Sequence, residues 1–350
     1  MTINDDYSEG LFYKAMHDLF SQIAEFSNYD LVVGIPFYHE KPEQLQALLY
    51  SVDKVLESWI GRRQLIICIG DSAAAENCEM INKLKLTHPQ IAFVLPAEIS
   101  GRGNSIRAML EIGKRLEADL LIFNANMAGN KGPGIEDAWL ENLLTPIQGH
   151  YDMVLGSLRR FQGMDSIAHM LAAPILESFY GCRISDPLGG IYALAHDFVE
   201  ELAREARFWG QCIGGYGIDF WLLTRALCWD KSICEVNMGG AVTPHTLASR
   251  NRIFYDTSLA LFECLKRDSA IWLQERLVIK VTDILARREV KKADLTVYPI
   301  PELLQNFKTG CSQYANIIEQ CSAQEMIAAI VNLPEEIGRA SCRERVYACV

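Results

Sequence analysis

Residues 31–40 read Leu-Val-Val-Gly-Ile-Pro-Phe-Tyr-His-Glu. The first six form an apolar run that is too short for a helix and that ends at a proline, which predicts a buried strand over residues 31–36. Polar side chains follow this strand directly. Because ligands of open parallel sheets bind at the carboxyl ends of the strands, the segment after the strand is a first candidate for a functional site.

The same pattern recurs along the first half of the chain. Short apolar runs alternate with segments in which apolar residues have helical spacing. The predicted strands are 65–70, 91–95 and 120–123, and the predicted helices are 8–27, 41–58, 76–86 and 101–116. Strands that alternate with helices are typical of a parallel sheet with helices on both faces. We therefore predict an α/β fold.

The second half continues the pattern and ends in helices. The predicted helices are 135–148, 166–180 and 217–229, and the predicted strands are 152–158, 189–195 and 233–238. Residues 251–287 have the pattern of a long amphipathic helix, continuous or interrupted, and residues 301–333 indicate further helices. We expect one α/β domain with a helical C-terminal extension.

Charge and cysteine content exclude several classes of protein. Lys and Arg total 33 against 44 Asp and Glu, which gives a net charge of -11, so general nucleic-acid binding and attraction to anionic membranes are disfavoured. The sequence has no apolar run long enough to span a bilayer and starts with an acidic segment that is unlike a secretory signal. Its eleven cysteines include no C-x-x-C pair, so we expect reduced thiols, a cytoplasmic protein and no structural zinc.

The end of the chain has an unusual sequence. Residues 337–346 read IGRASCRERV, which a common sequencing-adapter sequence encodes when it is read in frame. We expect residues 336–350 to be adapter read-through and leave them out of the fold prediction. The alternative is a genuine basic tail.

Four polar features follow predicted strands or open a predicted helix. They are the segment from Pro36 to Glu40, Asp71, the Gly101-Arg102-Gly103 turn, and Asn124-Ala125-Asn126. Each has an ordinary structural explanation, since an aspartate after a strand is most often a helix cap or a turn residue. Four such features at strand ends together predict a site at this edge of the sheet.

The turn at residues 101–106, Gly-Arg-Gly-Asn-Ser-Ile, is close to G-x-G-x-x-G but lacks the last glycine. It also follows a late strand, whereas the dinucleotide-binding motif belongs to the first strand–helix turn, so nicotinamide binding is disfavoured. Glycines before a helix N-terminus still favour an anion, and Arg102 and Arg107 would add positive charge. The alternative is an ordinary loop with a helix cap.

The order of these motifs resembles that of nucleotide-sugar glycosyltransferases of the GT-A type over residues 30–250. The closest resemblance is to the glucosyl-3-phosphoglycerate and mannosylglycerate synthase group, which is family 2-like, and to glucosylglycerate relatives. The resemblance implies that Pro36, Glu40 and Asp71 hold the nucleoside of a donor such as a UDP-sugar. It also implies that Gly101, Arg102, Gly103 and Arg107, which match a family GKG-x-x-x-R turn, lie near the diphosphate.

Two later glycine motifs are the most specific part of the resemblance. The turn from Pro187 to Ala193 matches a family turn that lines the sugar and acceptor site, with Gly189 and Gly190 at its centre. Residues 215–219, Gly-Tyr-Gly-Ile-Asp, match a family turn that opens a helix, which implies that Tyr216 binds substrate and that Asp219 orients substrate hydroxyls. His245 is the best match to a family metal ligand.

Two positions depart from the family pattern. The family has D-x-D after the fourth strand, where carboxylates bind Mg²⁺ or Mn²⁺, whereas this chain has a degenerate motif with Asn124 and Asn126. An amide oxygen can coordinate such a cation, but without the negative charge of a carboxylate. The family acid in the P-x-GG turn is replaced by Ile191. A weakened divalent-cation site would consist of Asn124, Asn126 and His245.

The resemblance implies a glycosyltransferase that moves a sugar from a nucleoside diphosphate to a small acidic or glycosidic acceptor with retention, with Asp219 and Arg102 in the catalytic site. The alternative is a catalytically silent GT-A relative that binds a nucleotide sugar or a protein partner. The expected domains are an N-terminal helix (1–28), a GT-A-like domain (29–250) and a helical region (251–335). The C-terminal helices would form a homodimer.

Overall fold

The fold is that of a computed structural model, which describes residues 3–24, 26–59, 61–125, 137–159, 167–241, 247–274, 280–285 and 300–321. The chain divides into two compact units, Met1–Ala293 and Asp294–Val350. The suspected adapter sequence lies outside the described residues. In the second unit, the described helices are α12 (Ile300–Gln313) and α13 (Ala315–Cys321), which overlap the helical segment predicted over residues 301–333.

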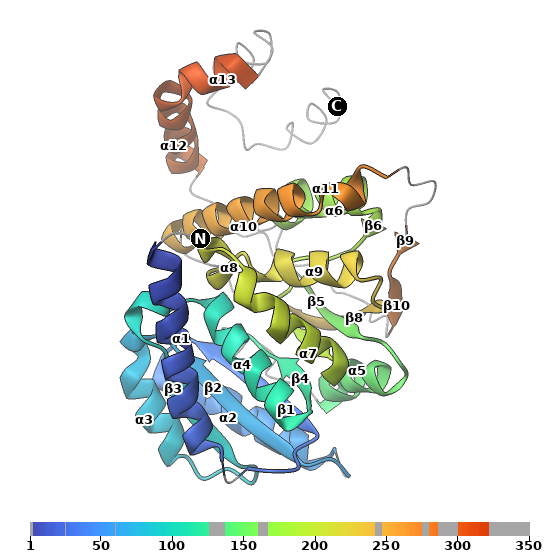
Figure 1. The fold of residues 1–350 in the computed structure, drawn as a ribbon. Helices are drawn as coiled ribbons and strands as arrows, with labels where there is room; N and C mark the ends of the chain where they lie inside the picture. The colour runs from blue at the N-terminus through green and yellow to red at the C-terminus, as the bar shows by residue number, and fades with distance from the viewer. Residues whose placement is uncertain are drawn as a thin grey trace. The chain divides into compact units, whose positions relative to one another are not determined.

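The first unit is built on a mostly parallel sheet (Figure 1). Its eight strands lie in the order β10-β8-β5-β7-β4-β1-β2-β3, and all pair in parallel except β7. The strands are β1 (Leu31–Phe37), β2 (Gln64–Gly70), β3 (Gln90–Val94), β4 (Asp119–Ile122), β5 (Met153–Arg159), β7 (Tyr192–Leu194), β8 (Ile233–Ala241) and β10 (Asp283–Leu285). A short parallel pair, β6 (Cys182–Arg183) and β9 (Lys280–Val281), forms a second sheet.

Helices cover both faces of the large sheet (Figure 1). The helices of this unit are α1 (Ile3–Gln22), α2 (Pro42–Glu57), α3 (Ala75–Lys83), α4 (Arg102–Leu116), α5 (Asp137–Gln148), α6 (Ala173–Tyr180), α7 (His196–Glu205), α8 (Gln211–Gly214), α9 (Ile218–Cys228), α10 (Leu247–Arg267) and α11 (Ser269–Trp272). The predicted α/β fold, a mostly parallel sheet flanked by helices, is confirmed by this topology.

The central position of β1 explains its apolar sequence. Val33 pairs with Ile66 of β2 on one side and with Leu121 of β4 on the other. Val32 belongs to the core that contains α4 and α7, whereas Val33 belongs to the core that contains α2 and α5. Because successive side chains of a strand point to opposite faces, a strand that is buried on both faces has an unbroken apolar run instead of an alternating one.

The structure corrects two predictions in the second half. The strand expected over residues 189–195 is shorter, and as β7 it runs antiparallel between β4 and β5. The long helix expected to reach residue 287 is interrupted after Arg267 and continues as the short α11. The strands β9 and β10 come next, and they pair with β6 and β8 respectively. Helix α7, which the sequence analysis did not predict, carries a buried face of Phe198, Val199 and Leu202. Among the described helices, none has a stretch long and apolar enough to cross a bilayer.

A buried carboxylate fixes the loop before β3 to helix α2. Asp53 of α2 accepts hydrogen bonds from the backbone N–H groups of Thr87 and His88, both at 2.9 Å, and its carboxylate lies 2.8 Å from Nδ1 of His88. Burial acts to raise the pKa of Asp53, but the hydrogen bonds from Thr87 and His88 outweigh it and lower the pKa overall.

We expect Asp53→Asn to lower the free energy of unfolding by about 1–3 kcal/mol at neutral pH, since the charged acceptor of several hydrogen bonds is lost. Because the folded-state pKa is the lower one, this contribution is complete above the ordinary aspartate pKa of about 3.9 and is lost as the pH falls through the folded-state value. Urea unfolding of both proteins from pH 7 downward measures it. The Asp18→Asn variant, at an exposed position, is the control. The prediction would be contradicted if the difference in unfolding free energy between wild type and Asp53→Asn grew toward low pH.

Candidate functional site

Segments from distant parts of the chain meet at the carboxyl edge of the large sheet. Glu40 lies after β1, Asp71 after β2 and Asn124 after β4. Because β7 is antiparallel to β4, the segment that precedes β7 lies at this same edge. Gly190 is in this segment, with φ +74°, and a Cβ built on it would lie 2.1 Å from Nδ2 of Asn124. Only glycine therefore fits both the backbone conformation and the space.

Two glycine turns are in direct backbone contact at this edge. The N–H of Gly103, in the first turn of α4, donates to the carbonyl of Gly215 at 2.9 Å. A Cβ on Gly103 would lie 1.8 Å from the carbonyl oxygen of Ile213, and one on Gly101 would lie 2.5 Å from that of Gly214. The glycines of these two motifs therefore allow the N-terminus of α4 to pack against the turn that leads into α9.

Arg102 connects the turns through a buried hydrogen-bond network. Its Nε donates to Oδ1 of Asn124 at 3.1 Å, its Nη2 donates to the Gly190 carbonyl at 3.4 Å, and its Nη1 forms an ion pair with Asp219 of α9. The hydroxyl of Tyr192, at the start of β7, donates to the same carboxylate at 2.7 Å. The structure thus brings Arg102, Asn124, Gly190 and Asp219 together.

The charges in this network balance each other. Burial acts to lower the pKa of Arg102, but the neighbouring Asp219 and Tyr192 raise it overall, so the guanidinium stays charged. Burial and the Asp219 charge raise the pKa of Tyr192 well above its ordinary value, although Arg102 opposes them. Tyr192 is therefore a neutral donor to the ion pair.

Two acidic side chains follow β1 and β2 at the same edge of the sheet. Oε2 of Glu40 accepts from the backbone N–H of Tyr38 at 2.6 Å. Burial raises the pKa of Glu40; the Tyr38 N–H opposes this rise, and the charge of Asp71 adds to it. Oδ1 of Asp71 accepts from the N–H of Ala73 at 3.0 Å and caps a short helical turn. The structural role considered for Asp71 is thus present, and its second oxygen makes no hydrogen bond among the described residues.

The Gly-Tyr-Gly turn is also held from α10. The backbone N–H of Tyr216 donates to Oδ2 of Asp256 at 3.1 Å, and Nε of Arg252 lies 2.9 Å from both Asp256 oxygens. Asp256 is 2% exposed. No sequence motif singles out this residue. The sequence signal that could have found it is the spacing to Ala260. This buried residue comes four residues after Asp256, so the two lie on the same face of α10.

Arg107, which was expected near a diphosphate, pairs with a residue of α1 instead of joining the hydrogen-bond network of Arg102. Its two terminal nitrogens pair with the carboxylate of Glu9 in α1 at 2.7 and 2.5 Å, and its guanidinium lies 4.0 Å from the ring centre of Phe12. Only 3% of its side chain is exposed. Arg107 therefore joins α1 to α4, because five residues of helix turn its side chain about 140° away from that of Arg102.

The described residues do not fit a divalent cation. Two of the expected ligands, Asn126 and His245, lie outside the described residues. The third, Asn124, directs its amide oxygen at the positive guanidinium of Arg102. In the part of the chain that the structure describes, no three His, Cys, Asp or Glu residues are placed to hold a metal ion. A neutral oxygen beside a fixed cation is a poor ligand for Mg²⁺ or Mn²⁺.

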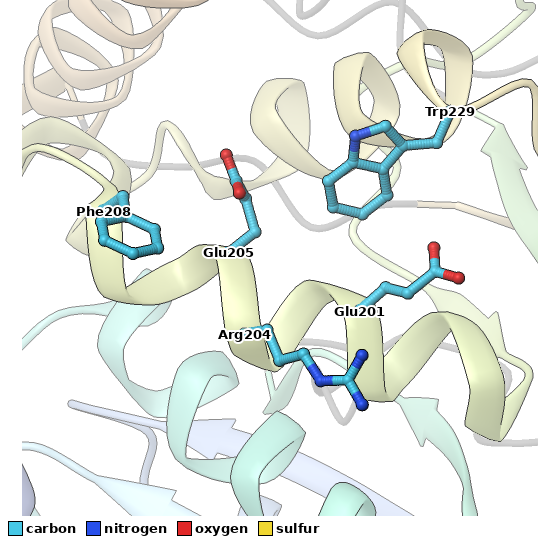
Figure 2. A pocket seen from close by; sticks show the side chains of 5 residues that line it. All are labelled: Glu201, Arg204, Glu205, Phe208 and Trp229. Carbon is cyan, nitrogen blue, oxygen red and sulfur yellow. The ribbon is translucent and has the colours of Figure 1, made fainter.

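A shallow pocket of about 310 Å³ lies away from these residues, against α7 and the end of α9 (Figure 2). Figure 2 shows Trp229 facing the side chains of α7 across it. The lining residues are Glu201, Arg204, Glu205, Phe208 and Trp229. Trp229 follows the C-terminal end of α9, whereas Asp219 is in its first turn, so the pocket is separate from the cluster at the sheet edge.

Comparisons with known proteins give structural similarity alone. No family model matches the chain, and no curated protein matches it. A glucosyl-3-phosphoglycerate synthase from Mycobacterium tuberculosis, solved with Mn²⁺, UDP and phosphoglyceric acid, is 14% identical with a TM-score of 0.48, covering 71% of this chain and 82% of that one. The same enzyme with Mn²⁺, UDP-glucose and phosphoglyceric acid gives 16% and 0.48, covering 72% and 84%. A mycobacterial protein gives 15% and 0.47, covering 71% and 78%.

Proposed function

We propose that this protein is a nucleotide-sugar glycosyltransferase that moves a sugar from a nucleoside diphosphate to a small acidic or glycosidic acceptor with retention. The observation that carries the proposal is the meeting of four separated motifs at one sheet edge, through the contacts of Gly103 with Gly215 and of Arg102 with Asn124, Gly190 and Asp219. Open parallel sheets bind their ligands at this edge.

The proposed roles follow from position along the edge. Pro36, Glu40 and Asp71, at the ends of β1 and β2, would hold the nucleoside. Arg102 at the N-terminus of α4 would face the diphosphate, where a guanidinium stabilises the charge that develops on the leaving group.

The glycine turns would form the sugar and acceptor side of the site. Gly189, Gly190 and Tyr216 lie on the segments that contact Arg102 and α4, and burial raises the pKa of Tyr216, which keeps its hydroxyl neutral. Asp219 would act through Arg102, since its carboxylate already accepts from Arg102 and Tyr192. It is therefore better placed to position the guanidinium than to serve as a general base.

One observation favours the second candidate, a catalytically silent relative that binds a nucleotide sugar or a protein partner. Arg102 and Asp219 already satisfy each other in a buried pair, with exposed side-chain fractions of 6% and 12%. A closed network of this kind supports binding without requiring turnover. Sugar transfer from a nucleotide sugar to an acidic acceptor, such as a phosphoglycerate, separates the two candidates. The expected homodimer stays a prediction.

Thermal unfolding of the full chain with UDP, GDP and their sugars, with and without Mn²⁺, tests the proposed function. A nucleotide at a hundred times its Kd is expected to stabilise the fold by about 2.7 kcal/mol. Asp71→Asn retains a capping oxygen and is expected to keep the stability of the free protein while losing most of the ligand-induced shift. Asp18→Asn is the matched control. If none of the nucleotides stabilised the protein, the proposal would be contradicted.

A further inference from the structure

The guanidinium of Arg102 is hydrogen-bonded to a residue of the expected metal motif. Asn124 occupies the first position of the expected metal motif, and its Oδ1 accepts from Nε of Arg102 at 3.1 Å. A divalent cation on this oxygen would lie against the positive charge of Arg102 and be repelled by it. The amide nitrogen of Asn124 lies against Gly190, where a Cβ would come within 2.1 Å of it, so this contact requires a glycine at residue 190.

The guanidinium is fixed in place before any ligand arrives. Arg102 is 6% exposed, and hydrogen bonds to Asn124, Asp219 and Gly190 use three of its five N–H groups within the described part of the chain. Tyr192 donates to Asp219 and so holds the counterion. A cation held in this way needs little reorganisation when an anion binds. Arginine also presents paired N–H groups that suit phosphate oxygens.

The neutral amide at residue 124 is consistent with this arrangement. An aspartate there would place a second carboxylate against Arg102, beside Asp219, and would leave the cluster with a net negative charge in the absence of a metal ion. Such a cluster repels a diphosphate. With asparagine, the groups that are hydrogen-bonded to Arg102 include one carboxylate, that of Asp219, which balances the charge of Arg102, and Arg102 also contacts the glycine turn at Gly190.

We infer that the site binds the diphosphate of its nucleotide through Arg102 without a divalent metal ion, and that Asn124 maintains this by keeping the Arg102 site free of a further negative charge. The inference rests on the proposed function and states how the same site supplies positive charge. It makes two statements that can be measured: nucleotide affinity is independent of Mn²⁺, and Asn124→Asp weakens that affinity when no metal is present.

Isothermal titration calorimetry of the full chain with UDP and with GDP, in EDTA and in Mn²⁺, tests the inference. We expect the nucleotide that binds to have the same Kd within about twofold in both buffers. Asn124→Asp is expected to weaken binding in EDTA about tenfold, and Mn²⁺ is expected to restore part of it, because the added carboxylate supplies the charge that a metal ligand needs.

Variants of Arg102 provide the second part of the test. Arg102→Met is expected to weaken binding about tenfold to a hundredfold in both buffers, as the loss of a charged hydrogen-bond donor does. Because this change leaves Asp219 buried and unpaired, the double variant Arg102→Met/Asp219→Asn provides a neutral version if the single variant does not fold. Arg115→Met, an exposed arginine on the same helix, is the control and is expected to bind like the wild type.

The outcomes separate the two proposals. Nucleotide binding that is lost in EDTA and present in Mn²⁺ would overturn the metal-independent site and leave the proposed function standing. Equal binding in both buffers that survives Arg102→Met would also overturn it, since another group would then hold the diphosphate. Binding of no nucleotide in either buffer would overturn the proposed function, and this inference with it.

Discussion

Asp268→Ala is expected to lower the free energy of unfolding by about 3–5 kcal/mol, because it leaves a buried guanidinium without a counterion. Asp268 precedes α11 and pairs with Arg225 of α9, with only 3% and 5% of the two side chains exposed. The hydroxyl of Tyr180, at the end of α6, donates to the same carboxylate at 2.9 Å. The carboxylate therefore joins three helices. Thermal and urea unfolding measure the loss, with an expected fall in Tm of about 10 °C.

A matched control separates burial from charge. Glu79→Ala removes an exposed carboxylate that pairs with Lys83 at 3.3 Å, and its expected effect is within about 0.5 kcal/mol. The double variant Arg225→Met/Asp268→Ala removes both buried charges and is expected to recover part of the stability. Equal losses for the single and double variants would show that packing, and not the unpaired charge, explains the effect.

Gly103→Ala is expected to cost about 3 kcal/mol and to weaken nucleotide binding, since the new methyl group meets backbone on the other glycine turn. The nearest atoms to such a Cβ are the Ile213 carbonyl oxygen at 1.8 Å and the carbonyl carbon of Gly214 at 2.7 Å. Backbone cannot turn aside as a flexible side chain can. The turn must move, and Arg102 moves with it because it is the adjacent residue. Thermal unfolding and UDP or GDP titration measure the two effects.

Substitution of another glycine within a helix is expected to have the opposite effect on stability. Gly10 lies in α1 with an exposed position, and a Cβ on it would meet no atom within 4 Å. Gly10→Ala is therefore expected to stabilise the protein by about 0.5–1 kcal/mol through helix propensity, with nucleotide binding unchanged. If both alanine variants were stabilised, the contact between the two glycine turns would be absent in solution.

Much of the site could be located from the sequence because strand ends and glycine turns have local signatures. The ends of β1, β2 and β4 were predicted from short apolar runs, and the turns at Gly103 and Gly215 from their glycines. Proximity followed from a general property of parallel sheets. Asp256 was not found, since no local pattern shows that a carboxylate on α10 accepts from the N–H of Tyr216.

The sequence by itself determined the α/β alternation, the buried strands and the glycine positions, because these depend on residue periodicity and on the absence of a Cβ. Only the tertiary structure decided that β7 is antiparallel, that Arg102 faces Asn124 and Asp219, and that Arg107 pairs with Glu9. Arg102 and Asp219 are 117 residues apart, and their pairing depends on how whole helices pack. Periodicity predicts which face of a helix is buried, whereas the partner of a buried charge depends on contacts between distant elements.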